Sequence, residues 1–236
     1  MSLFDVGHVA KLHEIQTARL RAGQEGIGAQ VDELIRRLEL GGVNQWRIHA
    51  KRLWDRGFGR DPVVNAKNFK TYLQGIPQIP AGLLADDADL SLLSLADPRP
   101  GLLRSCKLLG VLYEELGYSE GDAVPFDERF AIPVTPFWFR HDDGRKNRER
   151  RPDHCREEPT NDILVGTAME GIFAYAHHPH IVVQGEHIID LPGTVPRGLR
   201  VSCAYLGVWG GQTGLDLSRH SGIPGPGCGS LCVRRK

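Results

Sequence analysis

Residues 160–193 read TNDILVGTAMEGIFAYAHHPHIVVQGEHIIDLPG and contain the clearest fold signals in the chain. Apolar side chains recur at helical spacing within residues 167–175, which predicts a helix packed against a sheet. The histidines and the proline at 177–179 are expected to end this helix. β-branched residues are then dense over 181–191, with one polar interruption, and this predicts a hairpin or a bulged strand. Pro192-Gly193 is a turn signal that closes it.

Upstream of this stretch the pattern is helical. Apolar residues at helical spacing predict helices over residues 5–22, 31–38, 46–54 and 102–116. Asp61-Pro62 has the form of an N-cap followed by proline at the first helical position, so a further helix is expected to start there.

Past residue 121 the signals change to those of strands, which are expected at residues 131–139, 199–209 and 215–217. The charged segment 140–158 is expected to be a loop, and the glycine- and proline-rich segment 222–230 is expected to lack regular structure.

Helical signals in the first half and strand signals in the second favour an α+β fold over a doubly wound parallel sheet. We expect a helical N-terminal part packed on a mixed or antiparallel sheet in the C-terminal half. The corresponding division is 1–120 and 121–236, either as two parts or as one continuous domain.

The charge of the chain is balanced, with 29 Lys and Arg, 29 Asp and Glu, and a formal net charge of +0. Tight binding to a polyanion is therefore not expected, and nucleic acid is not an expected partner. No apolar run is long enough to span a bilayer and no signal peptide is visible, so no membrane partner is expected either. The five cysteines are odd in number and widely spaced, which indicates reduced thiols and a cytoplasmic protein.

The C-terminal half contains four short motifs: Arg150-x-Pro152-x-x-Cys155-Arg156, Thr167-Ala168-x-Glu170-Gly171, His178-Pro179 and Asp190-Leu191-Pro192-Gly193. With these motifs, residues 125–232 resemble a family of uncharacterised bacterial proteins of unknown function. The resemblance implies a bacterial cytosolic protein. It implies no activity and no catalytic residues.

The strongest ligand-binding signal is segment 140–151, in which six of twelve residues are basic. Guanidinium groups bind phosphate or carboxylate bidentately, and Trp138 offers a stacking face beside them. We expect a small anionic ligand here, with Trp138, Arg140, Arg145 and Arg148 among its contacts. The alternative is a solvated loop whose charges pair with one another.

The histidines form a second cluster, because four of the ten lie at positions 177, 178, 180 and 187. Imidazole is the commonest metal ligand, but no HExxH motif accompanies them, and the Cys228-x-x-x-Cys232 pair lacks a defined second pair. We therefore expect no metal and no cofactor. Histidines also suit the C-terminal end of a helix, whose dipole they complement. His178 and Glu170 complete the candidate ligand contacts, and Glu170 could act as an acid or base beside a histidine or arginine.

Three classes of function remain open at this level. The first is a protein that binds a small anionic ligand with the arginine-rich segment. The second is an enzyme that uses His, Glu and Arg of the C-terminal half, although no known catalytic motif is present. The third is a structural protein whose helices mediate assembly into a homo-oligomer.

Overall fold

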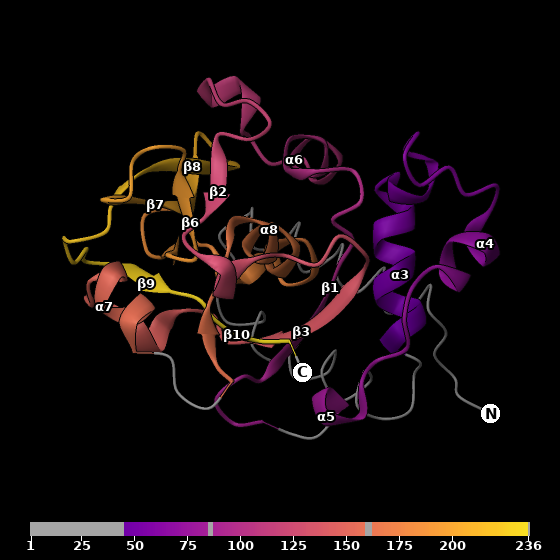
Figure 1. Ribbon diagram of the computed structural model, residues 1–236, viewed down its shortest axis with the longest axis horizontal. Coiled ribbons are helices and arrows are strands. Elements are labelled where there is room, and N and C mark those ends of the chain that lie inside the picture. The colour runs from indigo at the N-terminus through magenta and orange to yellow at the C-terminus, as the bar shows by residue number, and fades with distance from the viewer. Residues whose placement is uncertain (1–44, 85–86, 159–161, 236) are drawn as a thin grey trace.

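The computed structural model describes residues 45–84, 87–158 and 162–235. The helices predicted over 5–22 and 31–38 lie outside these residues. Within them, helices and two mixed or antiparallel sheets surround the central helix α8, Ala168–His177 (Figure 1). The predicted α+β class is confirmed, with sheets concentrated in the C-terminal half.

Helix α8 begins and ends through local chemistry. The Thr167 side chain accepts a hydrogen bond from the backbone N–H of Glu170, and the Glu170 carboxylate accepts one from the backbone N–H of Thr167. This reciprocal capping box satisfies two N–H groups that have no partner within the helix. Ile172, Phe173 and Ala174 are fully buried, because α8 contacts β1 of one sheet and strands of the other.

The first sheet has the strand order β1-β3-β10-β4 and is antiparallel throughout. Its strands are β1 (Leu92–Ala96), β3 (Phe137–His141), β10 (Cys232–Arg234) and β4 (Leu164–Val165). Strand β1 comes from the first 120 residues and pairs with β3 from the later part of the chain. The last described strand, β10, lies inside the sheet between β3 and β4.

The second sheet has the order β8-β7-β5-β9, in which only β5 and β9 are parallel. Its strands are β5 (Ile188–Leu191), β7 (Ser202–Trp209), β8 (Gln212–His220) and β9 (Cys228–Ser230). A separate antiparallel pair joins β2 (Ala123–Pro125) to β6 (Thr194–Pro196).

The other helices lie around this framework, with α3 and α4 at one end and α7 beside β9 at the other (Figure 1). The α-helices are α3 (Gln45–Asp55), α4 (Phe69–Gln74), α5 (Ala81–Leu84), α6 (Leu102–Leu109) and α7 (Pro152–Glu157). Short 3-10 helices are η1 (Phe58–Arg60), η2 (Glu114–Leu116), η3 (Glu128–Phe130), η4 (Arg145–Asn147) and η5 (Pro179–Ile181).

Two helix predictions in the N-terminal half need correction. No helix starts at Asp61-Pro62, because the Asp61 carboxylate closes a local turn to the backbone N–H of Val63, 3.0 Å away, and α4 starts after its own N-cap, Asn68. The helix predicted over 102–116 ends at Leu109, since Gly110 adopts a left-handed conformation there with φ 70°.

Four predictions in the C-terminal half need correction as well. The strand expected over 131–139 begins only at Phe137 with β3, and residues 131–136, which include two prolines, form no strand. Segment 140–158 is not one loop: Arg140 and His141 belong to β3, and η4 and α7 follow. The strand expected over 181–191 is confined to β5, because 179–187 form η5 and a tight turn closed by the Val183–His187 bridge. The segment 222–230 contains β9, which pairs with β5.

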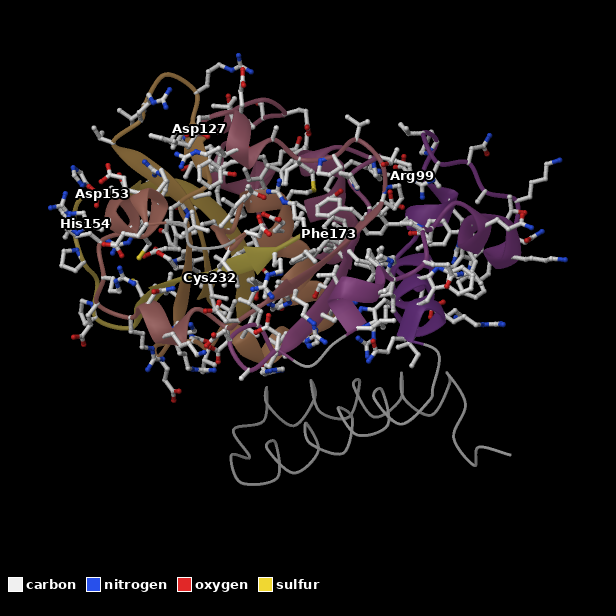
Figure 2. All side chains as sticks on the ribbon, turned by 60° about the horizontal axis from the view of Figure 1, so that its bottom comes forward. Arg99, Asp127, Asp153, His154, Phe173 and Cys232 are labelled. Atoms are coloured by element: carbon white, nitrogen blue, oxygen red, sulfur yellow. The ribbon has the colours of Figure 1, made fainter. Side chains whose placement is uncertain are left out.

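One hydrophobic core joins the two sheets through α8. Phe173 of α8 lies in the interior of the molecule (Figure 2) and its ring contacts Phe58 of η1, with the two ring centroids 5.4 Å apart. Residues of α3, α6, β1, β3, β5 and β7 belong to the same cluster. Among the helices that the structure describes, none combines the length and hydrophobicity needed to cross a bilayer.

Candidate functional site

A cleft of about 250 Å³ opens where β3, η4, α7 and the edge of the first sheet meet. Its polar lining includes Asp142, which directly follows β3, Lys146 and Asn147 of η4, and Arg150. Cys155 of α7 and Cys232 of β10 contribute thiols. The remaining lining residues are Asp89, Leu90, Glu158, Ile163, Leu164 and Val165. Cys232 marks the position of the cleft on β10 in Figure 2.

The buried side of the cleft is held by Asp142. Its Oδ1 accepts hydrogen bonds from the backbone N–H groups of Gly144, at 3.0 Å, and of Cys232, at 2.8 Å. Burial nevertheless raises the pKa of the Asp142 carboxyl to about 6, because desolvation destabilises the charged form by more than these two hydrogen bonds stabilise it. This carboxyl therefore favours a ligand group that can donate a hydrogen bond.

Asn147 links Arg150 to Cys232. Its Nδ2 donates to the backbone carbonyl of Ser230 at 3.0 Å and to Cys232 Sγ at 3.1 Å, while its Oδ1 accepts from Arg150 Nη1 at 2.9 Å. The hydrogen bond to Asn147 therefore fixes the orientation of the Arg150 guanidinium group.

Both cations of the cleft are paired at its rim. Arg150 donates to Glu158 and Lys146 donates to Asp89, and all four side chains are largely exposed. Ion pairs of this kind contribute only about 0–1 kcal/mol to stability. An anionic ligand can therefore replace either acid at small cost.

All five cysteines of the chain are free. The two that line the cleft are protonated at neutral pH, since burial raises the pKa of the Cys155 thiol and raises that of Cys232 to about 12. They contribute soft, weakly polar surface to the cleft rather than thiolate nucleophiles.

The six residues singled out in the sequence are absent from this lining. Arg140 is buried in β3 and donates to the backbone carbonyls of Leu83, at 2.7 Å, and Leu90, at 3.2 Å. Trp138 is buried two residues earlier and its Nε1 donates to the carbonyl of Pro77 at 2.8 Å. Both side chains connect β3 to the segment around α5.

The two other arginines of the predicted set, Arg145 and Arg148, are not among the residues that line the cleft. Arg145 is exposed and pairs with Asp143. Arg148 Nε donates to His187 Nδ1 at 3.2 Å, and His187 Nε2 donates to the carbonyl of Asp143 at 2.7 Å. Lys146 and Arg150 of the same segment line the cleft instead.

Glu170 is fully buried, and besides the capping box it receives Arg235, whose Nε lies 2.7 Å from Glu170 Oε1. Arg235 also donates to the carbonyl of Ala131 at 2.8 Å. The carboxylate thus ties the N-terminal end of α8 to the residue that follows β10. Its described contacts join it to neither Arg140 nor His178.

The histidines at the end of α8 bond to the backbone of β1. His177 Nε2 donates to the carbonyl of Leu95 at 2.9 Å, and His178 Nε2 donates to that of Leu93 at 3.0 Å. Strand β1 is the edge of its sheet, so these carbonyls face away from β3 and need other donors. Burial holds the pKa of His178 well below its ordinary value, which keeps the ring neutral.

A third imidazole, His141, lies next to this edge and has the geometry of a base beside a hydroxyl. Its Nδ1 donates to the carbonyl of Asp142 at 2.7 Å, which leaves Nε2 to accept from Ser94 Oγ at 2.9 Å. Burial lowers the pKa of His141 to about 4. Both side chains are fully buried, so the pair links β1 to β3 rather than facing a substrate.

Within residues 45–84, 87–158 and 162–235, no three His, Cys, Asp or Glu side chains are grouped so that they could hold a metal ion. The cleft residues Asp142, Asn147 and Cys232 escaped the sequence reasoning because their convergence depends on the pairing of β10 with β3. The position of Asp142 directly after a strand was the one local signal for it.

Comparisons of the chain with models of known protein families, with curated proteins and with solved structures find no significant match. The resemblance of residues 125–232 to a bacterial family, and the six candidate ligand contacts, therefore stay predictions. The fold and the cleft are the basis for a functional proposal.

Proposed function

We propose that this protein binds, in the cleft, a small molecule that carries an anionic group and a hydrogen-bond donor. The observation that carries the proposal is the convergence of Lys146 and Arg150 on one side of a concave site whose buried side is formed by Asp142 and Asn147. Concave sites with a few converging polar groups are where proteins usually hold small ligands.

The anionic group belongs beside Arg150 and Lys146. Arg150 is already oriented by Asn147, so less side-chain entropy is lost when its guanidinium group binds a carboxylate or phosphate. The ligand would take the place of Glu158 or Asp89, whose exposed ion pairs are weak.

The donor group belongs beside Asp142, whose buried carboxyl has a raised pKa. An ammonium or hydroxyl group of the ligand would compensate the desolvated charge of Asp142 above pH 6. A cleft that presents cations and a carboxylate together suits amino acids, hydroxy acids and similar polar metabolites. Its volume of about 250 Å³ lies just below the range of about 300–1,000 Å³ that is typical of drug-sized ligands.

The test is a thermal-shift screen of amino acids, hydroxy acids and sugar phosphates, followed by calorimetric titration of the compounds that stabilise the protein. Lys146→Ala with Arg150→Ala should weaken their binding by about tenfold or more, because hydrogen bonds to charged groups are lost. The matched control is Arg145→Ala with Arg148→Ala, which removes the same charge from the same segment outside the cleft lining. It should change affinity by no more than about twofold.

Two results would contradict the proposal. One is a screen in which no compound raises the melting temperature of the wild-type protein. The other is a loss of binding in the Arg145/Arg148 variant with none in the Lys146/Arg150 variant, which would support the original prediction for the arginine-rich segment instead.

A further inference from the structure

Two arginines stack on one phenylalanine at the surface beside α7. The guanidinium carbon of Arg156 lies 3.9 Å from the centroid of the Phe126 ring, and that of Arg200 lies 4.1 Å from the same centroid. Two planar groups this close to one centroid would overlap if they shared a face, so they occupy opposite faces of the ring. Phe126 therefore separates two like charges and attracts both through its π-electrons.

Arg156 is a buried cation with an unused donor. It is only 4% exposed, its Nε donates to the carbonyl of Pro192 at 2.8 Å, and its Nη2 is buried without a hydrogen-bond acceptor in the described part of the chain. No carboxylate of the described residues forms an ion pair with it. Its neighbour Asp153 pairs with Arg151 and acts on Arg156 only as a more distant charge. A buried charge without a compensating partner is costly, so the fold retains this one at a price in stability.

Arg200 adds an accessible cation to the same place. It is exposed, its Nη2 donates to the carbonyl of Phe126 at 2.7 Å, and among the described residues it forms no ion pair. Asp127, which follows Phe126 in the chain, pairs with Arg129 at 2.7 Å, and Arg200 acts on its carboxylate only as a more distant charge. Figure 2 shows Asp127 and, on α7, Asp153 at the surface of this end of the molecule.

We propose that Arg156 and Arg200, held by Phe126, form a site for a phosphate group, distinct from the cleft. Guanidinium groups bind phosphate through paired N–H donors. Neither of these two forms an ion pair with a described carboxylate, and Asp153, Glu157 and Asp127 act on them only as more distant charges. A phosphate at the edge of the ring would neutralise both cations and supply an acceptor for Arg156. None of these three residues lines the cleft, so the inference goes beyond the proposed function.

The burial of Arg156 limits how a phosphate can enter this site. Arg156 Nη2 is fully covered, so a phosphate meets the exposed Arg200 first, and it reaches Arg156 only when the side chains that cover Nη2 move. Burial and the neighbouring Arg200 both lower the pKa of Arg156, and a bound dianion would reverse that effect.

The experiment is a calorimetric titration with inorganic phosphate, using sodium chloride at matched ionic strength as the reference. Wild-type protein should bind at least one phosphate, and Arg200→Ala should weaken binding at this site by about tenfold or more. Arg197→Ala is the matched control, because Arg197 is an exposed neighbouring arginine whose Nε donates to the carbonyl of Gly121 and which does not stack on Phe126. Binding to this control should stay within about twofold of the wild-type value.

Arg156 is tested by Arg156→Lys, checked by circular dichroism, because removing a buried side chain can unfold the protein. The folded lysine variant should also bind phosphate more weakly, since an ammonium group loses the planar pair of donors. Phosphate monoesters form a second arm of the titration: tighter binding of an ester than of free phosphate assigns the site to a phosphorylated metabolite, and the reverse order assigns it to the ion.

Titration of the Lys146→Ala, Arg150→Ala variant separates this site from the cleft. Phosphate binding that persists in this variant and disappears in Arg200→Ala supports the second site, whatever the outcome for the cleft. The inference is overturned if wild-type protein prefers phosphate no more than chloride, if the Arg200 and Arg197 variants behave alike, or if only the cleft variant loses binding.

Discussion

Buried polar side chains in this protein serve mainly to complete the hydrogen bonds of the backbone. His177 and His178 supply donors to the outer carbonyls of β1, and Arg140 does the same for the backbone around α5. An unpaired carbonyl in the interior costs about 1–3 kcal/mol, so each of these side chains has a structural reason to be where it is. His177 and His178 are adjacent in the sequence because two carbonyls of the edge strand β1 require hydrogen-bond donors.

Asp190 is a buried residue whose charge is only partly compensated. Its Oδ1 accepts from Arg219 Nε at 3.1 Å, but Oδ2 has no hydrogen-bond donor in the described residues. Burial raises its pKa to about 6 despite the nearby Arg219. When folding raises the pKa of a carboxyl, its contribution to the free energy of unfolding is fully present below the pKa that it has in the unfolded chain. This contribution is lost as the pH rises through the pKa that it has in the folded protein.

We therefore expect Asp190→Asn to change the pH dependence of stability. Between about pH 4 and pH 6 the unfolding free energy of the wild type should fall relative to that of the variant, by up to ~3 kcal/mol, since one pKa unit corresponds to about 1.4 kcal/mol. Urea unfolding of both proteins at several pH values measures this difference. The opposing effect of the buried histidines, whose lowered pKa values destabilise the fold in acid, is common to both proteins and cancels.

Asp127→Asn is the control for this measurement. Its hydrogen bonds and ion pair with Arg129 lower the pKa of Asp127, so the wild type should gain stability over this variant as the pH rises. The two differences should have opposite slopes. A difference for Asp190→Asn that does not depend on pH would show that its carboxyl titrates as it does in the unfolded chain.

The elements pack so closely at one point that only glycine fits. Strand β9 passes the loop before η4, and a Cβ on Gly229 would lie 2.1 Å from the carbonyl oxygen of Gly144. Gly144 itself has φ 78°, a left-handed conformation that suits glycine. This contact sets the distance between the second sheet and the segment that carries Lys146 and Asn147.

Gly229→Ala should therefore destabilise the protein by about 1–3 kcal/mol or more, the usual cost of overpacking, and should weaken ligand binding in the cleft. Gly75→Ala is the control, because Gly75 has φ −85° and the nearest atoms to a Cβ there lie at an ordinary 3.4 Å. The control should stay within about 1 kcal/mol of the wild type. Equal stability of the two variants in urea unfolding would show that the loop before η4 yields easily.

At the scale of the whole molecule, α8 connects the two sheets. Each sheet also combines strands from distant parts of the chain: β1, β3 and β10 lie next to one another in the first, and β5 and β9 in the second. The edge of β8 is covered too, since Leu112 exchanges backbone hydrogen bonds with Thr213 and Leu215. Local unfolding of almost any of these elements would expose side chains of the shared core.

We expect residues 45–235 to unfold in one cooperative transition. Tryptophan fluorescence reports on both ends, because Trp138 lies in the first sheet and Trp209 in the second. For the wild type, Trp138→Phe and Trp209→Phe, the urea curve followed by fluorescence should coincide with the circular dichroism curve of the same protein. Separate transitions for the two tryptophans would favour the predicted division at residue 120 into two independent parts.

Local sequence signals were sufficient to predict the helices and strands that depend on interactions between nearby residues. The apolar period of α8, the strand density of β5 and β7 and the helical α3 follow from interactions within a few residues, so these elements and the α+β class were predictable. The same reasoning failed at Leu109 and at Asp61, where one left-handed glycine and one side-chain turn outweighed the periodicity.

The tertiary structure decided which charges are buried and which face solvent. Segment 140–151 was predicted to belong to one charged loop. Arg140 is nevertheless buried, because carbonyls more than forty residues earlier, at Leu83 and Leu90, compensate its charge, whereas Lys146 and Arg150 line the cleft. The site also needs β10 between β3 and β4, which brings Cys232 beside Asp142. Contacts over such sequence separations depend on the packing of the whole chain around α8, and no periodicity or spacing within the segment encodes them.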